Sequence, residues 1–196
     1  ILNTNGDVLD LWTDAYEVIN SCNNVINALD VVVAADQNRV RGEALALRAW
    51  AHFELTRMFG QQYEAGIDNT QLAVPLILIP TLAFGDNVDV TRNTVEECYN
   101  QVITDLTEAE SLLPESNDVF INKYTAAALL ARVYLQKADY AAARDAANRV
   151  IASGDYELNN TYAECFAQDD PTDEDIFSAE NSELDNSNVM VTYFAI

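Results

Sequence analysis

The chain has 196 residues, of which 49% are hydrophobic and 21% charged, the composition of a folded domain rather than of a disordered segment. Its 32 acidic residues far outnumber its 10 lysines and arginines, so the net charge is −22. This charge repels the phosphates of nucleic acids and of anionic lipids, and we therefore exclude nucleic acid as a partner.

Two long helices are predicted in the N-terminal third, because apolar residues recur there at intervals of three and four. The first covers about residues 7–31 and the second about 37–59, with Gly60 as the stop. The face expected to pack in the first helix comprises Val8, Leu11, Ala15, Val18, Ile19, Cys22, Val25, Ile26 and Leu29. The face expected in the second comprises Val40, Ala44, Leu47, Ala51, Leu55 and Met58.

Residues 61–92 are predicted to be irregular, since Gly66, Pro75, Pro80 and Gly85 interrupt them. Between the two prolines lies the longest apolar run, which we expect to form a buried strand or an extended loop. The run is far shorter than the ~20 residues that a membrane-spanning helix needs.

A third helix is predicted over residues 94–113, ending before Pro114. It opens with a capping box, in which Thr94 accepts from the backbone amide of Glu97 and the Glu97 side chain reaches back. The face expected to pack comprises Val95, Cys98, Val102, Leu106, Ala109 and Leu113.

A helical hairpin is predicted over residues 123–137 and 139–153, with Asp139 as the N-cap of its second helix and Gly154 as its stop. Its small residues and tyrosines follow the order of a tetratricopeptide repeat, at Leu130, Ala131, Tyr134, Tyr140, Ala143 and Ala147. The tyrosine pairs 134/140 and 156/162 are interpreted as repeat packing. One hairpin cannot bury its own apolar face, so we expect it to stack with the first two helices.

The predicted fold is therefore mainly α-helical, a tetratricopeptide-like stack of helical hairpins with a minor β-strand near the C-terminus. We expect one domain over residues 1–196, in which 155–196 form an acidic extension of irregular structure and short strands. One such strand is expected over 189–196. We interpret the chain as part of a longer protein.

A series of motifs follows in an order that is found in a known family. The motifs are Trp12, Tyr16, Ile19 and Cys22-Asn23-Asn24-Val25-Ile26, the run 42–60, Val74-Pro75-Leu76, the run 92–99, Asp105-Leu106, Ala109, Leu112-Leu113-Pro114, the hairpin 126–151, the run 153–158, and the run 174–177. In this order they resemble the SusD/RagB family, over roughly residues 8–180.

The resemblance implies a non-enzymatic, surface-exposed lipoprotein of the outer membrane that binds a nutrient, usually a glycan and sometimes a peptide. It also implies a SusC-like TonB-dependent transporter as partner, and attachment to the membrane only through a lipid anchor outside this segment. In this family the helix stack meets the transporter. We therefore expect the solvent faces of 37–59 and 123–153 to contact the transporter, and loops to contact the glycan. Two other functions stay open: a scaffold that binds protein segments in its helical groove, and a glycan hydrolase.

Arg48 lies on a helix built of apolar residues and is interpreted as the partner of a buried carboxylate, with a ligand clamp as the alternative. Glu43 is one residue too far away for an ideal pair on the same helix. His52, the single histidine, is interpreted as a hydrogen-bonded helix residue, because a metal site needs more ligands.

Three aromatic residues, Trp12, Tyr16 and Trp50, could stack on sugar rings. Their helical spacing favours the core instead, with Trp12 as the best candidate for an exception. We assign no catalytic, cofactor-binding or metal-binding residue and leave the ligand-binding residues unassigned.

Cysteines and acidic residues give no specific site. Cys22 and Cys98 are interpreted as buried, inert thiols, and no C-x-x-C pair is present. The acidic run 169–175 lacks the spacing of a calcium loop and is interpreted as a solvated loop. The only lysines are Lys123 and Lys137, and this scarcity predicts a source in salty water, with an ordinary acidic extracellular protein as the alternative.

Overall fold

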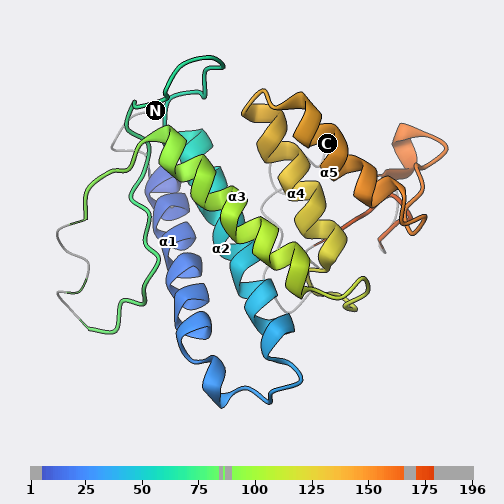
Figure 1. Ribbon diagram of the computed structural model, residues 1–196, viewed down its shortest axis with the longest axis horizontal. Coiled ribbons are helices and arrows are strands. Elements are labelled where there is room, and N and C mark those ends of the chain that lie inside the picture. Colours follow the sequence, from blue (N-terminus) through green and yellow to red (C-terminus); the bar gives the residue numbers. More distant parts are fainter. Residues whose placement is uncertain (1–5, 84–85, 87–89, 166–170, 179–196) are drawn as a thin grey trace.

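Five α-helices form the frame of the computed structural model, which describes residues 6–83, 86, 90–165 and 171–178 (Figure 1). In chain order they are α1 (Gly6–Asn27), α2 (Gln37–Phe59), α3 (Val95–Leu112), α4 (Lys123–Gln136) and α5 (Tyr140–Ile151). Two short 3₁₀ helices, Leu29–Val31 and Tyr162–Cys165, accompany them. All five predicted helices are confirmed.

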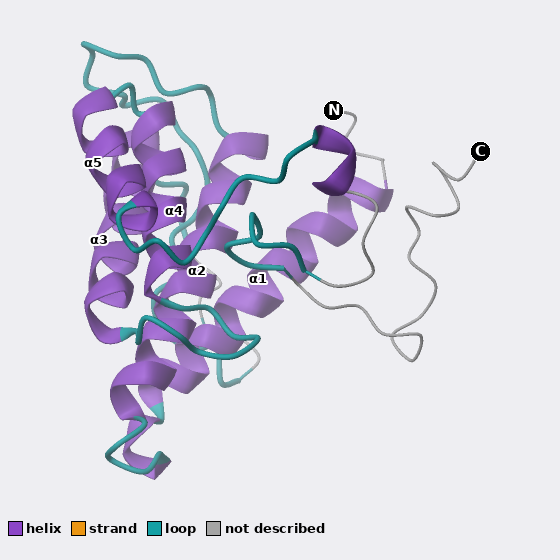
Figure 2. Ribbon diagram, turned by 90° about the vertical axis from the view of Figure 1, so that its right-hand side faces the viewer, coloured by secondary structure: helices purple, strands orange, loops and turns teal. Residues whose placement is uncertain are grey.

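The helices pack as neighbours in chain order, α1 on α2, α2 on α3, α3 on α4 and α4 on α5 (Figure 1). The third helix therefore lies between the first pair and the hairpin. Figure 2 shows helices and loops, and no strand within the described part of the chain. The predicted tetratricopeptide-like helical stack is thus confirmed.

Local signals in the sequence set the ends of several helices. The capping box is present, with Thr94 Oγ1 accepting from the amide of Glu97 at 3.2 Å and Glu97 accepting from the amide of Thr94 at 2.8 Å. Asp139 caps α5 by accepting from the amide of Ala142. Gly154 follows α5 with a positive φ of 75°, as a glycine stop requires.

Gly60 ends α2 for a different reason than predicted. Its backbone is extended, with φ −90° and ψ 170°, and so does not need the left-handed freedom of glycine. A Cβ at this position would lie 2.6 Å from the carbonyl oxygen of Thr56 and 3.1 Å from the Cβ of Ala73. Glycine lets the next segment pass close to the end of the helix.

The packing face predicted for α2 is wrong in part. Ala44 and Leu55 are buried, but Leu47 and Met58 are exposed. The helix contacts α1 and α3 at once, so it buries two strips of surface instead of one. The buried set is Gly42, Ala44, Leu45, Ala46, Arg48, Ala49, His52, Phe53, Leu55 and Thr56.

The face predicted for α1 is also wrong in part, and the helix ends four residues earlier than predicted, at Asn27 instead of residue 31. Leu11, Val18 and Val25 are exposed, whereas Ile19 and Cys22 are buried. The side that faces α2 includes the polar Asn23, which apolar periodicity does not count. By contrast, the whole predicted face of α3 is buried.

The apolar run between the prolines is an extended loop, the second of the two predicted alternatives. The one isolated bridge among the described residues, the antiparallel pair Leu72 and Thr94, lies before this run. The strand expected over 189–196 lies outside the described residues. Within the described part, no helix is long and apolar enough to cross a membrane.

The tyrosine pairs do not pack as predicted. Tyr134 packs against the core, but Tyr140 and Tyr162 are 68% and 81% exposed. Tyr156 packs edge-on against Tyr124 instead, with ring centroids 5.9 Å apart. The tetratricopeptide pattern of tyrosines therefore holds in only one of its two helices.

Candidate functional site

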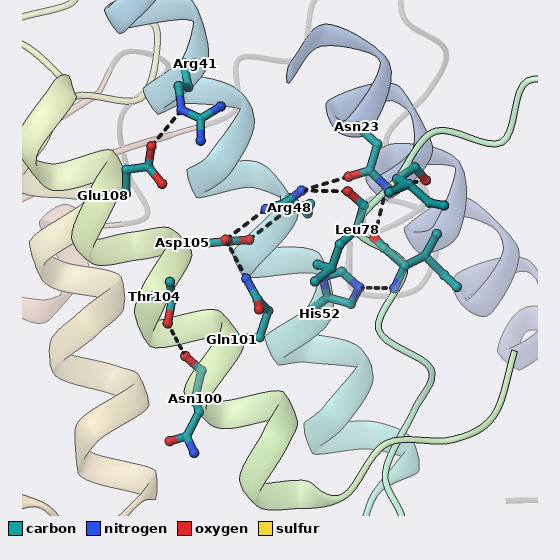
Figure 3. Close-up of polar contacts among 12 residues, drawn as sticks. Asn23, Arg41, Arg48, His52, Leu78, Asn100, Gln101, Thr104, Asp105 and Glu108 are labelled. Atoms are coloured by element: carbon teal, nitrogen blue, oxygen red, sulfur yellow. Dashed lines mark hydrogen bonds and ion pairs between the residues drawn. The ribbon is translucent and has the colours of Figure 1, made fainter. Parts of the chain in front are cut away.

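A small group of polar side chains is buried between α1, α2 and α3, and Arg48 of α2 lies in it. Its guanidinium donates to both carboxylate oxygens of Asp105 on α3, each at 2.8 Å (Figure 3). The two side chains are only 8% and 3% exposed. Gln101 also donates to Asp105, at 2.8 Å, and Nη1 of Arg48 donates to Asn23 on α1 at 2.9 Å. This arrangement confirms that Arg48 is the partner of a buried carboxylate.

Polar side chains of α1, among them Asn23, hold the extended segment 75–81 against the helices. The amide of Asn23 donates to the carbonyl oxygens of Ile77 at 2.9 Å and Ile79 at 3.1 Å. Asn20, one turn earlier on α1, accepts from the amide of Thr81 at 2.7 Å. Side chains thus satisfy the backbone of this segment in place of a neighbouring strand.

Two further side chains complete these contacts. Tyr16 donates to the carbonyl oxygen of Pro75 at 2.8 Å, and Asn93 accepts from the amide of Leu76 at 3.0 Å. We call Asn23, Arg48, Asp105 and their hydrogen-bonded partners the Arg48 cluster. Its polar groups are directed at each other and at the backbone, so it is a structural element.

His52 contributes a long hydrogen bond to the same segment. Its Nε2 accepts from the amide of Ile77 at 3.4 Å, and its Nδ1 is buried without a partner. Burial, together with the nearby charge of Arg48, lowers the pKa of His52 to about 4. The imidazole is therefore neutral at pH 7, and its interpretation as a hydrogen-bonded helix residue is confirmed.

The three aromatic candidates are all partly buried and pack against the hydrophobic core. The ring of Trp12 lies 4.8 Å from that of Phe59 and 5.0 Å from that of Tyr16. Trp50 packs edge-on against Phe177 at 6.0 Å. Trp12 and Tyr16 also border a hollow of about 280 Å³ between α1 and the extended segment.

A larger pocket lies elsewhere, between the C-terminal end of α2 and the turn between α4 and α5. These two segments are at the top of Figure 1. The pocket has a volume of about 520 Å³. Its walls come from the end of α2, the residues after it, α3 and the α4–α5 turn. They comprise Arg57, Met58, Gln61, Gln62, Tyr63, Tyr99, Leu135, Gln136, Ala138 and Tyr140. We call it the Gln–Tyr pocket.

Aromatic rings form part of the wall of the Gln–Tyr pocket. Tyr63 and Tyr99 are tilted against each other with centroids 5.1 Å apart. Tyr99 donates to Oε1 of Gln136 at 3.1 Å, and burial raises the pKa of this phenol to about 12. Tyr63 donates to Glu96, which is in turn paired with Lys137 at 2.6 Å. These bonds hold the side chains of Tyr63 and Tyr99 in place in the pocket wall.

The other sequence candidates form no site in the described structure. Cys22 and Cys98 are buried, and burial raises the pKa of both thiols, that of Cys22 to about 11. The part of the acidic run that is described, 171–175, makes local turns such as the bond from the amide of Thr172 to Asp175. No group of three metal-ligating side chains occurs among the described residues.

Sequence reasoning missed both Asn23 as a structural residue and the Gln–Tyr pocket. Asn23 stands in one of the family motifs, so its position was visible although its role was not. The pocket is built from segments up to 83 positions apart, from Arg57 to Tyr140, and no local pattern marks such a site.

The stacked helices and the side-chain-bound extended segment define a helical-repeat protein of tetratricopeptide-like type. More narrowly, residues 2–135 match the SusD-like family described as starch-binding and associating with the outer membrane. The chain belongs to this family, which confirms the resemblance of its motifs.

Individual relatives agree with this assignment. SusD-like protein P38 of Formosa agariphila is 30% identical over 148 residues, which are 75% of this chain and 27% of the relative. A SusD superfamily protein from Bacteroides thetaiotaomicron is 36% identical with a TM-score of 0.68, over 76% of this chain and 33% of that structure. A laminarin-binding SusD-like protein is 28% identical with a TM-score of 0.67, over 79% and 33%. The chain thus spans about a quarter to a third of the length of these relatives.

Proposed function

We propose that the protein containing this chain binds an oligosaccharide without turning it over and serves nutrient uptake at the outer membrane. The observation that carries this proposal is the match to the SusD-like family over residues 2–135. The similarity to a laminarin-binding protein over 79% of the chain supports a glycan as the ligand.

The partner in this proposal is a SusC-like TonB-dependent transporter, which would receive the captured glycan. The family description, association with the outer membrane, supports this location. Membrane attachment would come from a lipid anchor outside the described helices. The helical surface proposed to face the transporter is the solvent side of α2, where Leu47 and Met58 are exposed, together with that of the hairpin α4–α5.

The proposal is tested by titrating laminari-oligosaccharides, xyloglucan oligosaccharides and peptides into the full-length protein. Binding of an oligosaccharide without release of shorter products supports it. Binding of peptides alone would favour the scaffold function, and turnover that is lost on removal of one carboxylate would favour a hydrolase.

The transporter contact is tested separately on α5. Arg144 is well exposed, and its ion pair among the described residues is with its neighbour Asp145 at 2.7 Å, so a charge reversal there leaves the core intact. We expect Arg144→Glu to lower the amount of transporter recovered with the protein while sugar affinity stays unchanged. Loss of sugar binding with full transporter recovery would invert the assignment of the two surfaces.

A further inference from the structure

The Gln–Tyr pocket has hydrogen-bonding capacity that the protein itself does not use. Within the described structure, the side chains of Gln61 and Gln62 make no hydrogen bond, and Gln136 uses only its oxygen, which accepts from Tyr99. This bond to Oε1 leaves the Nε2 group of Gln136 as a donor toward the pocket. Arg57 donates to Glu54 through Nη1 alone, at 2.9 and 2.7 Å.

An exposed aromatic ring accompanies these polar groups. Tyr140, one of the lining residues, is 68% exposed, and Met58, another, is 49% exposed. The face of an aromatic ring is electron-rich and attracts the polarised C–H groups of a flat partner. A ligand that combines hydroxyl groups with an apolar C–H face fits both features, and a sugar ring is such a ligand.

The charged residues of the pocket lining also restrict which kind of ligand can bind. The lining contains one cationic residue, Arg57, and no carboxylate, although the chain as a whole carries 32 acidic residues. Two acidic side chains beside the lining are paired with cations, Glu54 with Arg57 at 2.7 Å and Glu96 with Lys137 at 2.6 Å. The lining therefore offers a sugar the guanidinium of Arg57, amide groups and aromatic rings, and it offers a cationic ligand no carboxylate of its own.

We propose that the Gln–Tyr pocket is an oligosaccharide subsite on the helical frame, in which Gln61, Gln136 and Arg57 bind sugar hydroxyls and Tyr140 stacks on a ring face. The volume of about 520 Å³ lies within the range of ~300–1,000 Å³ that is typical of small-molecule sites. The inference rests on the proposed glycan-binding function and adds a place on this chain where the glycan is held.

The test is a calorimetric titration of the full-length protein with laminari-oligosaccharide and, as the acidic sugar, oligogalacturonate. For whichever sugar the unaltered protein binds, Gln61→Ala, Gln136→Ala and Tyr140→Ala are each expected to weaken binding by roughly 3- to 10-fold, the worth of one hydrogen bond or ring contact. Tyr162→Ala removes a tyrosine that is 81% exposed and lies outside the pocket, and it is the matched control.

The outcomes separate the subsite from the proposed function. If the unaltered protein binds no sugar, the proposed function fails, and this inference fails with it. If it binds sugar and the three pocket variants bind as tightly as Tyr162→Ala, the subsite is refuted while the function stands. The melting temperature of each variant is measured as well. If it equals that of the unaltered protein, a loss of binding comes from the pocket and not from unfolding.

Discussion

The Arg48 cluster and the Gln–Tyr pocket are built from similar side chains, an arginine and several amides, and they use them in opposite ways. In the cluster, both oxygens of Asp105 and both groups of the Asn23 amide have partners within the protein. In the pocket, Gln61 and Gln62 keep their hydrogen-bonding groups for solvent or ligand. Polar groups that have partners in the interior indicate a structural role. Polar groups without partners in a pocket indicate a role in ligand binding.

A second ion pair between α2 and α3 shows how burial changes the effect of an ion pair on stability. Arg41 of α2 pairs with Glu108 of α3 at 2.6 Å, but these side chains are 34% and 40% exposed (Figure 3). Water already solvates this pair well, so its formation gains little. Removing one member of the Arg48–Asp105 pair instead leaves a charge in the interior.

The largest effect is therefore expected from Arg48→Met. This variant should lose about 3–5 kcal/mol of unfolding free energy, because Asp105 keeps its burial and loses its cation. Arg41→Met, the matched control, should lose about 1 kcal/mol or less. Urea denaturation of both variants measures the difference.

A double variant separates this account from a simple loss of packing. Arg48→Met/Asp105→Leu replaces the pair by apolar side chains and should recover most of the stability, as buried pairs elsewhere do. If the double variant is as unstable as Arg48→Met alone, the cost does not come from the uncompensated carboxylate.

The next largest effect is a dependence of stability on pH that comes from His52. Its pKa is about 4 in the folded chain and about 6.5 in the unfolded chain, so the unfolded state binds the proton first. The contribution is fully present above pH 6.5 and is lost as pH falls from 6.5 to 4, by about 3 kcal/mol in total. In His52→Gln, where the amide oxygen still accepts from Ile77, stability should fall less over this range than in the unaltered protein. Equal slopes for the two proteins would show that His52 does not titrate as described.

A smaller effect is expected from Asn23→Leu, which removes the donor to Ile77 and Ile79. Two carbonyl groups of the extended segment lose their donor, and the expected cost is about 1–3 kcal/mol. Asn24→Leu is the control, since the Asn24 amide donates only to Asn20 on its own helix. Faster amide hydrogen exchange at Ile77 and Thr81 in Asn23→Leu alone would locate the effect in the extended segment. Equal exchange in both variants would refute the role of Asn23 as its anchor.

The smallest effect is expected from salt, as a gradual rise of the melting temperature. With a net charge of −22, repulsion strains the folded chain, and salt screens it with a Debye length that falls from about 10 Å at 0.1 M to about 3 Å at 1 M. The melting temperature should rise as NaCl is raised from about 0.05 to 1 M. A flat or falling melting temperature would end the prediction of a salt-adapted surface.

The helices could be read from the sequence because period, caps and stops are local signals. The packing of α1 and α2 could not, since Asn23, Arg48 and His52 occupy core positions that apolar periodicity leaves out. Their burial depends on partners 25 to 57 residues away. The pairing of Arg48 was predictable in kind, because a buried arginine needs a carboxylate, but the identity of Asp105 was not. The Gln–Tyr pocket depends on the meeting of distant segments and left no pattern in the sequence.

The most direct test of the central distinction is the sugar affinity of the folded double variant Arg48→Met/Asp105→Leu, measured by calorimetry against the oligosaccharide that the unaltered full-length protein binds. We predict an affinity within about twofold of the unaltered protein, because the Arg48 cluster holds the frame and does not touch the ligand. Loss of sugar binding in a variant that still melts cooperatively would contradict the account and would make Arg48 a ligand clamp.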